Sequence, residues 1–318
     1  MAAPAPAPLP VSHARSISAS ARGSRLLPLL PLGPLGRRRR AVVAGAGGAT
    51  GIASARAALI PLGIVTLVML VLPTILATHS SLEITSAGPF HHPSLAYPLG
   101  TDDLGRDVFS RVLYGARASW LAALGVILIG AAFGALIGAV AGAFGGILDT
   151  ILMRVTDLFL ALPAPVLAIA VIASVGPSLL HTLLALSIVW WPWYARIVRG
   201  EVRALAGRPH AEAARLAGVG RTRLVLRHLL PGAFAPVIVA MSLDVGNLIL
   251  ALAALSFIGL GAPPPAAELG SMSARGLEYL FGYAWVPLAP AVGVAVLALL
   301  ANLLGEKANR SLDQRTTR

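Results

Sequence analysis

The sequence contains no cysteine, a single lysine and few charged residues of either sign. Without cysteine, disulfides, thiolate chemistry and cysteine-ligated metal sites are excluded. Charged residues make up only 12% of the 318 residues, about half the roughly 25% typical of a soluble domain. Hydrophobic residues make up 57%, and the mean hydropathy is +0.80. This composition predicts an all-α integral membrane protein.

The single lysine also argues against ATP hydrolysis by this chain. Lys307 follows Glu306 and does not stand in the Gly-Lys-Ser/Thr context of a phosphate-binding loop. No His, Asp and Ser residues cluster at one membrane depth, so we predict no catalytic residue and no cofactor bound by this chain. His79, His91 and His92 share one loop without regular ligand spacing, and we predict no metal site.

Six apolar segments have about the length that a helix needs to cross the hydrocarbon of a bilayer. Before them, residues 1–55 are rich in Ala, Pro, Ser and Arg and contain no acid, which predicts a disordered cytoplasmic tail. We expect the first span and an extracytoplasmic segment in 56–118, a five-helix core in 119–312, and a short tail in 313–318. The six predicted spans are 57–77, 119–143, 158–175, 179–195, 233–260 and 286–304.

The formal net charge of +12 is unevenly distributed between the loops. A basic chain can bind nucleic acid, but here the arginines flank apolar segments, which favours a role in membrane topology and no nucleic-acid partner. One set of segments holds 21 basic residues, and the other loops hold four. The first set is the tail, the 144–157 and 196–230 loops and the C-terminus. By the positive-inside rule both termini and the 196–230 loop are predicted to be cytoplasmic.

Two sets of residues within the spans have helical spacing. Four glycines repeat every four residues in the second span and predict a close packing face, whose partner can lie in this chain or in another. Asp244 and Asn247 lie three residues apart in the fifth span, where exposure to lipid is costly. They either line a substrate path or have a structural role, in an interhelical hydrogen bond or at a position near the membrane interface. The glycines are Gly130, Gly134, Gly138 and Gly142.

The cytoplasmic segment 209–232 reads as two short helices separated by a glycine. Pro209 suits a first helical turn, Glu212 complements the helix dipole, and Gly218 ends the helix. The second part alternates leucine with arginine, which predicts a separate helix at the membrane surface, with Pro231 starting the fifth span. A small-residue helix of this kind either docks into a groove on another protein or lies at the interface.

Glu212-Ala213-Ala214, Gly218 and Leu230-Pro231 are spaced as in the EAA loop, which this segment resembles. That loop is found in permease subunits of ATP-binding-cassette (ABC) importers; His228 stands where isoleucine is usual. The segments around 98–117, 144–157, 191–200 and 255–261 resemble the C-type permeases of the dipeptide/oligopeptide (nickel) family. The resemblance covers about 57–312, with departures at Leu252, where glutamate is frequent, and Leu269, where tryptophan is.

The resemblance implies a type I ABC importer permease fold in the cell membrane, with six spans and a cytoplasmic coupling helix. It implies a B-type second permease, two ATPase subunits that carry ATP and Mg, an extracytoplasmic binding protein and a peptide substrate. Nickel or another small solute is the alternative cargo within the family, and an ion-coupled secondary transporter or channel is the alternative outside it. The residues expected to couple to the ATPase are His210, Glu212, Ala213, Ala214, Leu216 and Gly218.

A polar segment precedes the second span on the predicted outer side. Its acids and arginine either pair locally and cap the next helix, with Thr101 as the N-cap, or contact a substrate-delivering protein. The residues are Thr101, Asp102, Asp103, Arg106 and Asp107.

Overall fold

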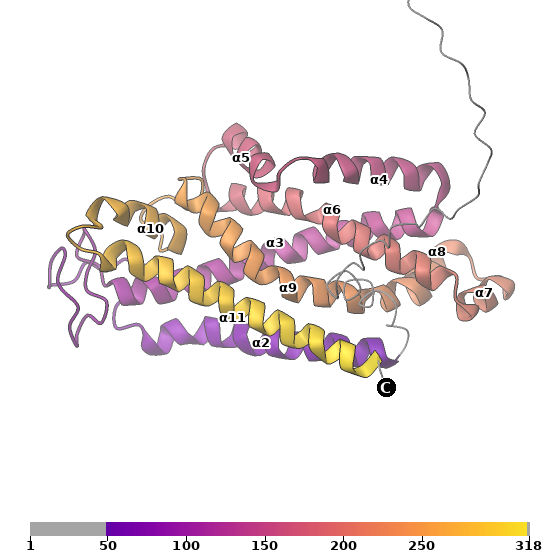
Figure 1. Ribbon diagram of the computed structural model, residues 1–318, viewed down its shortest axis with the longest axis horizontal. Helices are drawn as coiled ribbons and strands as arrows, with labels where there is room; N and C mark the ends of the chain where they lie inside the picture. The colour runs from indigo at the N-terminus through magenta and orange to yellow at the C-terminus, as the bar shows by residue number, and fades with distance from the viewer. Residues whose placement is uncertain (1–48, 317–318) are drawn as a thin grey trace, which may run out of the picture.

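The computed structural model describes residues 49–316, which form a bundle of helices without a β-strand in that range (Figure 1). Residues 1–48 of the predicted tail lie outside the described residues. Residues 49–55, which were predicted as part of the tail, belong to the first helix. The elements are α2 (Ala49–Leu76), α3 (Val108–Phe144), α4 (Gly146–Ala161), α5 (Ala164–Val175), α6 (Leu179–Ala206), α7 (Pro209–Leu216), α8 (Arg221–Leu224), a π-helical turn η1 (Val225–Leu229), α9 (Leu230–Phe257), α10 (Leu269–Gly276), η2 (Leu277–Tyr279) and α11 (Trp285–Thr316).

Within residues 49–316, four helices are long and apolar enough to cross a membrane: α2, α3, the run from α8 to α9, and α11. The predicted span 158–175 is not a single straight helix. The chain breaks there between α4 and α5, which meet at 90°. The residue before a proline is disfavoured in the α region, and Leu162, before Pro163, is extended with ψ 141°.

Counting the bent pair as one span gives five. The 28 residues of α6 make a helix of about 42 Å at 1.5 Å per residue, which is long enough for a sixth span. The count of six stays a prediction, because α6 is not among the helices that are apolar enough along their length to cross a membrane.

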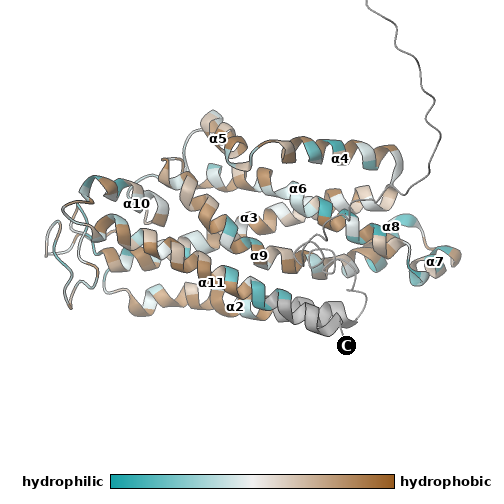
Figure 2. Cartoon of the chain, in the orientation of Figure 1, coloured by the Kyte–Doolittle hydropathy of each residue, from teal (hydrophilic) through white to brown (hydrophobic). Residues whose placement is uncertain are grey.

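The outer surface of the bundle is apolar. One face of α2 exposes large aliphatic side chains at helical spacing, and Figure 2 shows hydrophobic residues along the long helices and hydrophilic ones toward α7 and α8. A soluble bundle would place such a stripe against a core, so this surface is suited to lipid. The α2 stripe consists of Ile60, Ile64, Leu67, Val71 and Ile75.

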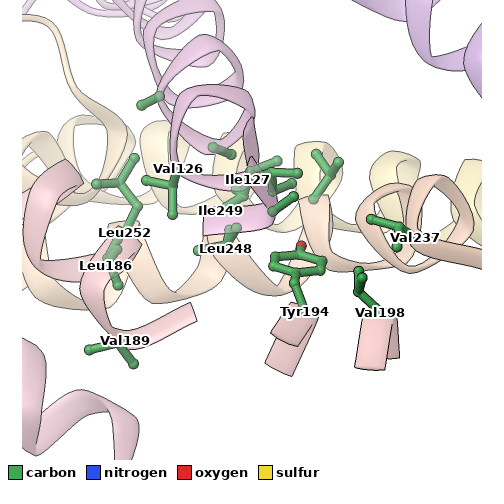
Figure 3. Close-up of a cluster of buried hydrophobic side chains, with 14 of the residues drawn as sticks. Val126, Ile127, Leu186, Val189, Tyr194, Val198, Val237, Leu248, Ile249 and Leu252 are labelled. Atoms are coloured by element: carbon green, nitrogen blue, oxygen red, sulfur yellow. The ribbon is translucent and has the colours of Figure 1, made fainter. Parts of the chain in front are cut away.

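The core lies where α3, α6 and α9 meet (Figure 3). The four glycines of α3 face α6 of the same chain, which answers the question of their partner. A Cβ added to Gly134 would lie 2.5 Å from the Trp191 carbonyl oxygen, and one added to Gly138 would clash with the Ala195 carbonyl oxygen. We call this contact the glycine seam: Gly130, Gly134, Gly138 and Gly142 on α3 against α6.

The two ends of the bundle differ in character. The start of α2, the end of α11 and the short α7 lie at one end, and α10 with the α2–α3 connection lies at the other (Figure 1). The helix that follows α7 is more continuous than predicted. Arg221–Phe257 is a single helical run, so the predicted separate surface helix and the restart at Pro231 are wrong. The π-helical turn precedes Pro231, whose missing N–H falls in the first turn of α9.

Candidate functional site

The helix α7 rests on the bundle through one narrow face and leaves the rest free. Ala211 is fully buried, and Ala214 packs against the core cluster. His210, Glu212, Ala213 and Leu216 are exposed. Leu216 is 90% exposed in a loop that carries several arginines, unlike the leucines on the bundle's apolar flanks. A projecting helix with small residues and one exposed leucine is suited to insertion into a groove on a partner.

Gly218 fixes where α7 ends. Its φ is +78°, in the left-handed region that costs other residues about 1–2 kcal/mol. The N–H of Val219 donates to the Ala214 carbonyl at 3.1 Å, and the N–H of Gly218 donates to the Arg215 carbonyl at 3.0 Å. These two bonds form a Schellman motif. Val219 and Ala214, the residues that usually touch in this motif, both pack on the core cluster. The motif therefore sets the direction in which the chain leaves α7.

A second polar site lies within the bundle. The Tyr194 hydroxyl of α6 donates to the Asp244 carboxylate of α9 at 2.9 Å. Asn247, one turn further along α9, is exposed at the bundle surface. Asp244 thus makes an interhelical hydrogen bond, one of the interpretations given above, while Asn247 lies beside it on α9 at the exposed surface of this chain. Tyr194 was missed because no local pattern links residues fifty positions apart.

The outer polar segment forms local structure, but with a different cap from the one predicted. Asp107, not Thr101, is the N-cap of α3: its carboxylate accepts from the N–H of Ser110 at 3.0 Å and of Phe109 at 3.3 Å. The Thr101 hydroxyl instead accepts from the His91 N–H at 2.7 Å and donates to the Gly88 carbonyl at 2.8 Å. The cap prediction was wrong because these loop partners cannot be seen from the α3 sequence.

The acids of this segment differ in how fully they are paired. Asp102 accepts from the Arg106 Nε at 2.8 Å and from two backbone N–H groups. Asp103 lies 3.8 Å from Arg106 and has a side chain that is 40% exposed. Arg111 is buried and donates to the Ser81 carbonyl at 2.6 Å, which fastens the loop to α3. In residues 49–316 no group of three His, Asp or Glu side chains is placed to hold a metal ion.

Ion pairs between α4 and α6 were not among the predicted sites. Asp149 of α4 is buried and accepts from the Arg199 guanidinium at 2.8 Å and from Arg203 at 2.7 Å. Asp157 accepts from Arg196 at 2.5 Å, with both side chains about half exposed. An acid in an otherwise apolar segment needs a basic partner, and this is the signal that would have found them. These pairs hold the bent α4 on the bundle.

Removing the charge of Asp149 should loosen this attachment. Asp149→Asn should destabilise the protein by about 1–3 kcal/mol, between the values for exposed and buried ion pairs, because Arg199 and Arg203 lose a shared partner. Asp157→Asn should cost less than about 1 kcal/mol. Thermal unfolding in detergent measures both, and equal melting temperatures for the two variants would contradict the assignment.

Comparison with known proteins agrees with this architecture. Residues 134–318 match the family described as binding-protein-dependent transport system inner membrane component. This range includes α7 and the helix α6, against which the glycine seam packs. The chain belongs to this family. As a family member with several apolar helices, this permease is a multi-pass membrane protein.

Relatives of this permease are named for peptide transport. A putative peptide transport system permease protein of Brucella suis is 40% identical over 258 residues, 80% of this chain and 87% of that protein. The probable D,D-dipeptide transport system permease protein DdpC of Escherichia coli is 39% identical, covering 79% of this chain and 84% of its own length. The dipeptide transport system permease protein DppC of Escherichia coli is 43% identical, covering 69% and 73%.

Proposed function

We propose that this permease forms half of the translocation pathway of an ATP-driven importer of di- or oligopeptides, and that α7 couples it to a separate ATPase subunit. The observation that carries the proposal is the projecting α7, with Leu216 90% exposed and Ala211 fully buried. The names of the relatives support the peptide cargo. ATP and Mg then belong to two partner ATPase subunits, and this chain performs no covalent chemistry.

The second permease is supported by the polar face of α9. A polar side chain that meets lipid within a span is unfavourable, and a charged one costs roughly 2.5–3.5 kcal/mol or more. Asp244 is only partly covered by this chain and Asn247 is exposed. We propose that this face meets a B-type permease or the path between the two permeases. The topology with both termini and α7 on the cytoplasmic side follows from the distribution of basic residues.

The fold offers a route for the coupling. Only Gly207 and Arg208 separate α6 from α7, and beyond Gly220 the chain continues as one helical run, Arg221–Phe257. That run is about 55 Å long at 1.5 Å per residue, and it carries Asp244. A displacement of α7 by the ATPase is therefore transmitted to the spans by two stiff helices. The binding energy of ATP thereby biases the equilibrium between two arrangements of the bundle.

Reconstitution tests the function. In proteoliposomes containing this permease and its partners, uptake of a labelled dipeptide should require ATP, the ATPase subunits and the extracytoplasmic binding protein. Glu212→Lys should greatly reduce copurification of the ATPase. Glu278→Lys, the same change at an exposed position directly after α10, which lies at the other end of the bundle (Figure 1), should not. Uptake driven by an ion gradient without any ATPase would instead establish the secondary-transporter alternative.

A further inference from the structure

A small charged cavity lies at the end of the bundle opposite α7. The α2–α3 connection, the start of α3, α10 and the start of α11 line it, and its volume is about 30 Å³. A water molecule needs about 10–15 Å³ measured in this way, so the cavity holds roughly two water-sized groups, such as the two oxygens of a carboxylate. It is too small for a peptide. Its polar lining consists of Asp102, Asp103, Arg106, Arg111, Arg275 and Tyr279.

The charges in this cavity are not balanced. Three arginines face two aspartates, and Asp102 already accepts from Arg106 and lies 3.5 Å from the Arg111 Nε. Arg111 also donates to backbone carbonyls of two loops. Glu268, which lies nearby, uses its carboxylate oxygens to cap α10 by accepting from the N–H groups of Gly270 and Ser271. The existing acids therefore have little remaining capacity to pair with a further arginine.

Arg275 is that further arginine. It is partly buried in α10, and among the side chains that the structure describes no carboxylate oxygen lies within 4 Å of its guanidinium. Burial and then the positive charge of Arg106 lower the pKa of Arg275. An added carboxylate would relieve this crowding of like charges and would match the fork of donors on the guanidinium.

Exposed apolar side chains close in sequence to the cavity-lining residues indicate the source of that carboxylate. Leu104 follows Asp103 in the chain, while Leu277 and Phe281 follow Arg275; they are 50%, 47% and 101% exposed. An arginine in a pocket beside exposed apolar side chains is the pattern of a protein–protein hot spot. A small free carboxylate would gain nothing from such side chains.

We propose that the Arg275 cavity receives an aspartate or glutamate side chain of the extracytoplasmic binding protein and anchors that protein on the permease. This inference rests on the proposed importer function. Arg275 then has a recognition role, whereas Arg111 and Asp102 hold the loops that form the cavity. Asp103, 40% exposed at its side chain, lies beside Arg106 and repels a misplaced acid.

The test measures binding of the peptide-loaded binding protein to the complete transporter in lipid nanodiscs. Arg275→Gln should weaken binding roughly tenfold or more, as expected for loss of one partner of a largely desolvated charge pair, and should make the affinity less dependent on salt. Arg275→Lys should recover part of the affinity. Arg117→Gln, a change at another outer arginine that does not line the cavity, should alter binding less than about twofold.

Equal affinities for Arg275→Gln and Arg117→Gln would overturn the inference. So would competition for binding by a free dipeptide acid but not by its C-terminal amide in the wild-type complex, because that result would make the peptide itself the source of the carboxylate. Copurification of the ATPase serves as a separate readout. If the ATPase copurifies but Arg275→Gln has no effect, only this inference fails; if neither protein binds the wild-type permease, the proposed function fails.

Discussion

Alanine in place of Gly134 should destabilise the permease clearly, and leucine there should leave little folded protein. The added Cβ would lie 2.5 Å from the Trp191 carbonyl oxygen and 2.9 Å from the Ala195 nitrogen. Both are backbone atoms of a packed helix, so α3 and α6 must move apart. Overpacking typically costs 1–3 kcal/mol, and we expect about 3 kcal/mol for alanine. The melting temperature in detergent and the amount of protein in membranes measure the effect.

Gly125 provides the matched control on the same helix. A Cβ there would meet nothing within 4 Å. Gly125→Ala should leave the melting temperature unchanged or raise it slightly, because alanine favours helix by up to about 1 kcal/mol over glycine. If Gly134→Ala and Gly125→Ala melted at the same temperature, the glycine seam would not be the close contact that the structure places there.

Valine in place of Gly218 should abolish transport while leaving the membrane bundle folded. The left-handed φ of +78° costs a β-branched residue at least about 1–2 kcal/mol, so the Schellman motif opens and α7 changes direction. We expect peptide uptake to fall by more than tenfold and ATP hydrolysis to become insensitive to peptide. The melting temperature of the purified permease should change little, because a Cβ at Gly218 meets nothing within 4 Å.

Gly220→Val is the control for this change. Gly220 is two residues away and is also exposed, but its backbone has φ −60° and ψ 150°, which valine adopts readily. Uptake by this variant should stay close to the wild-type rate. Comparable losses in the two variants would mean that bulk in the loop, and not the geometry of the α7 end, limits transport.

Features set by local chemistry were predictable from the sequence. The four-residue spacing of Gly130 to Gly142 identified a packing face, since any helix places those positions on one side. Gly218 was predicted as a helix end, because few other residues adopt the left-handed conformation there. Hydropathy located the long spans, because lipid requires apolar side chains over about twenty residues.

Features set by distant contacts were not predictable. The break between α4 and α5 has a local cause in Pro163, but the ion pairs of Asp157 and Asp149 that hold α4 on α6 join residues 39 and 54 positions apart. Hydropathy alone does not reveal such a break, because the segments on both sides of it are apolar. The hydrogen bond between Tyr194 and Asp244 also joins helices that are far apart in sequence.

The choice of helix cap failed for a related reason. Thr101 and Asp107 are both common N-cap residues and both precede α3. Thr101 is held by loop groups at Gly88 and His91, which leaves Asp107 as the cap. The partners that decide between two suitable cap residues lie in a loop whose path the sequence does not specify.

The absence of cysteine makes a direct test of the coupling helix simple. A Leu216→Cys variant carries one thiol, at a 90% exposed position of α7. A Phe281→Cys variant carries one thiol at an exposed position beyond α10, the helix at the opposite end of the bundle (Figure 1). In sealed vesicles of known orientation, a membrane-impermeant maleimide should reach the thiol at 216 only from the cytoplasmic face. Assembly with the ATPase should protect that thiol and allow its crosslinking to the ATPase. Labelling of position 216 from the outer face, or labelling unaffected by the ATPase, would contradict the account.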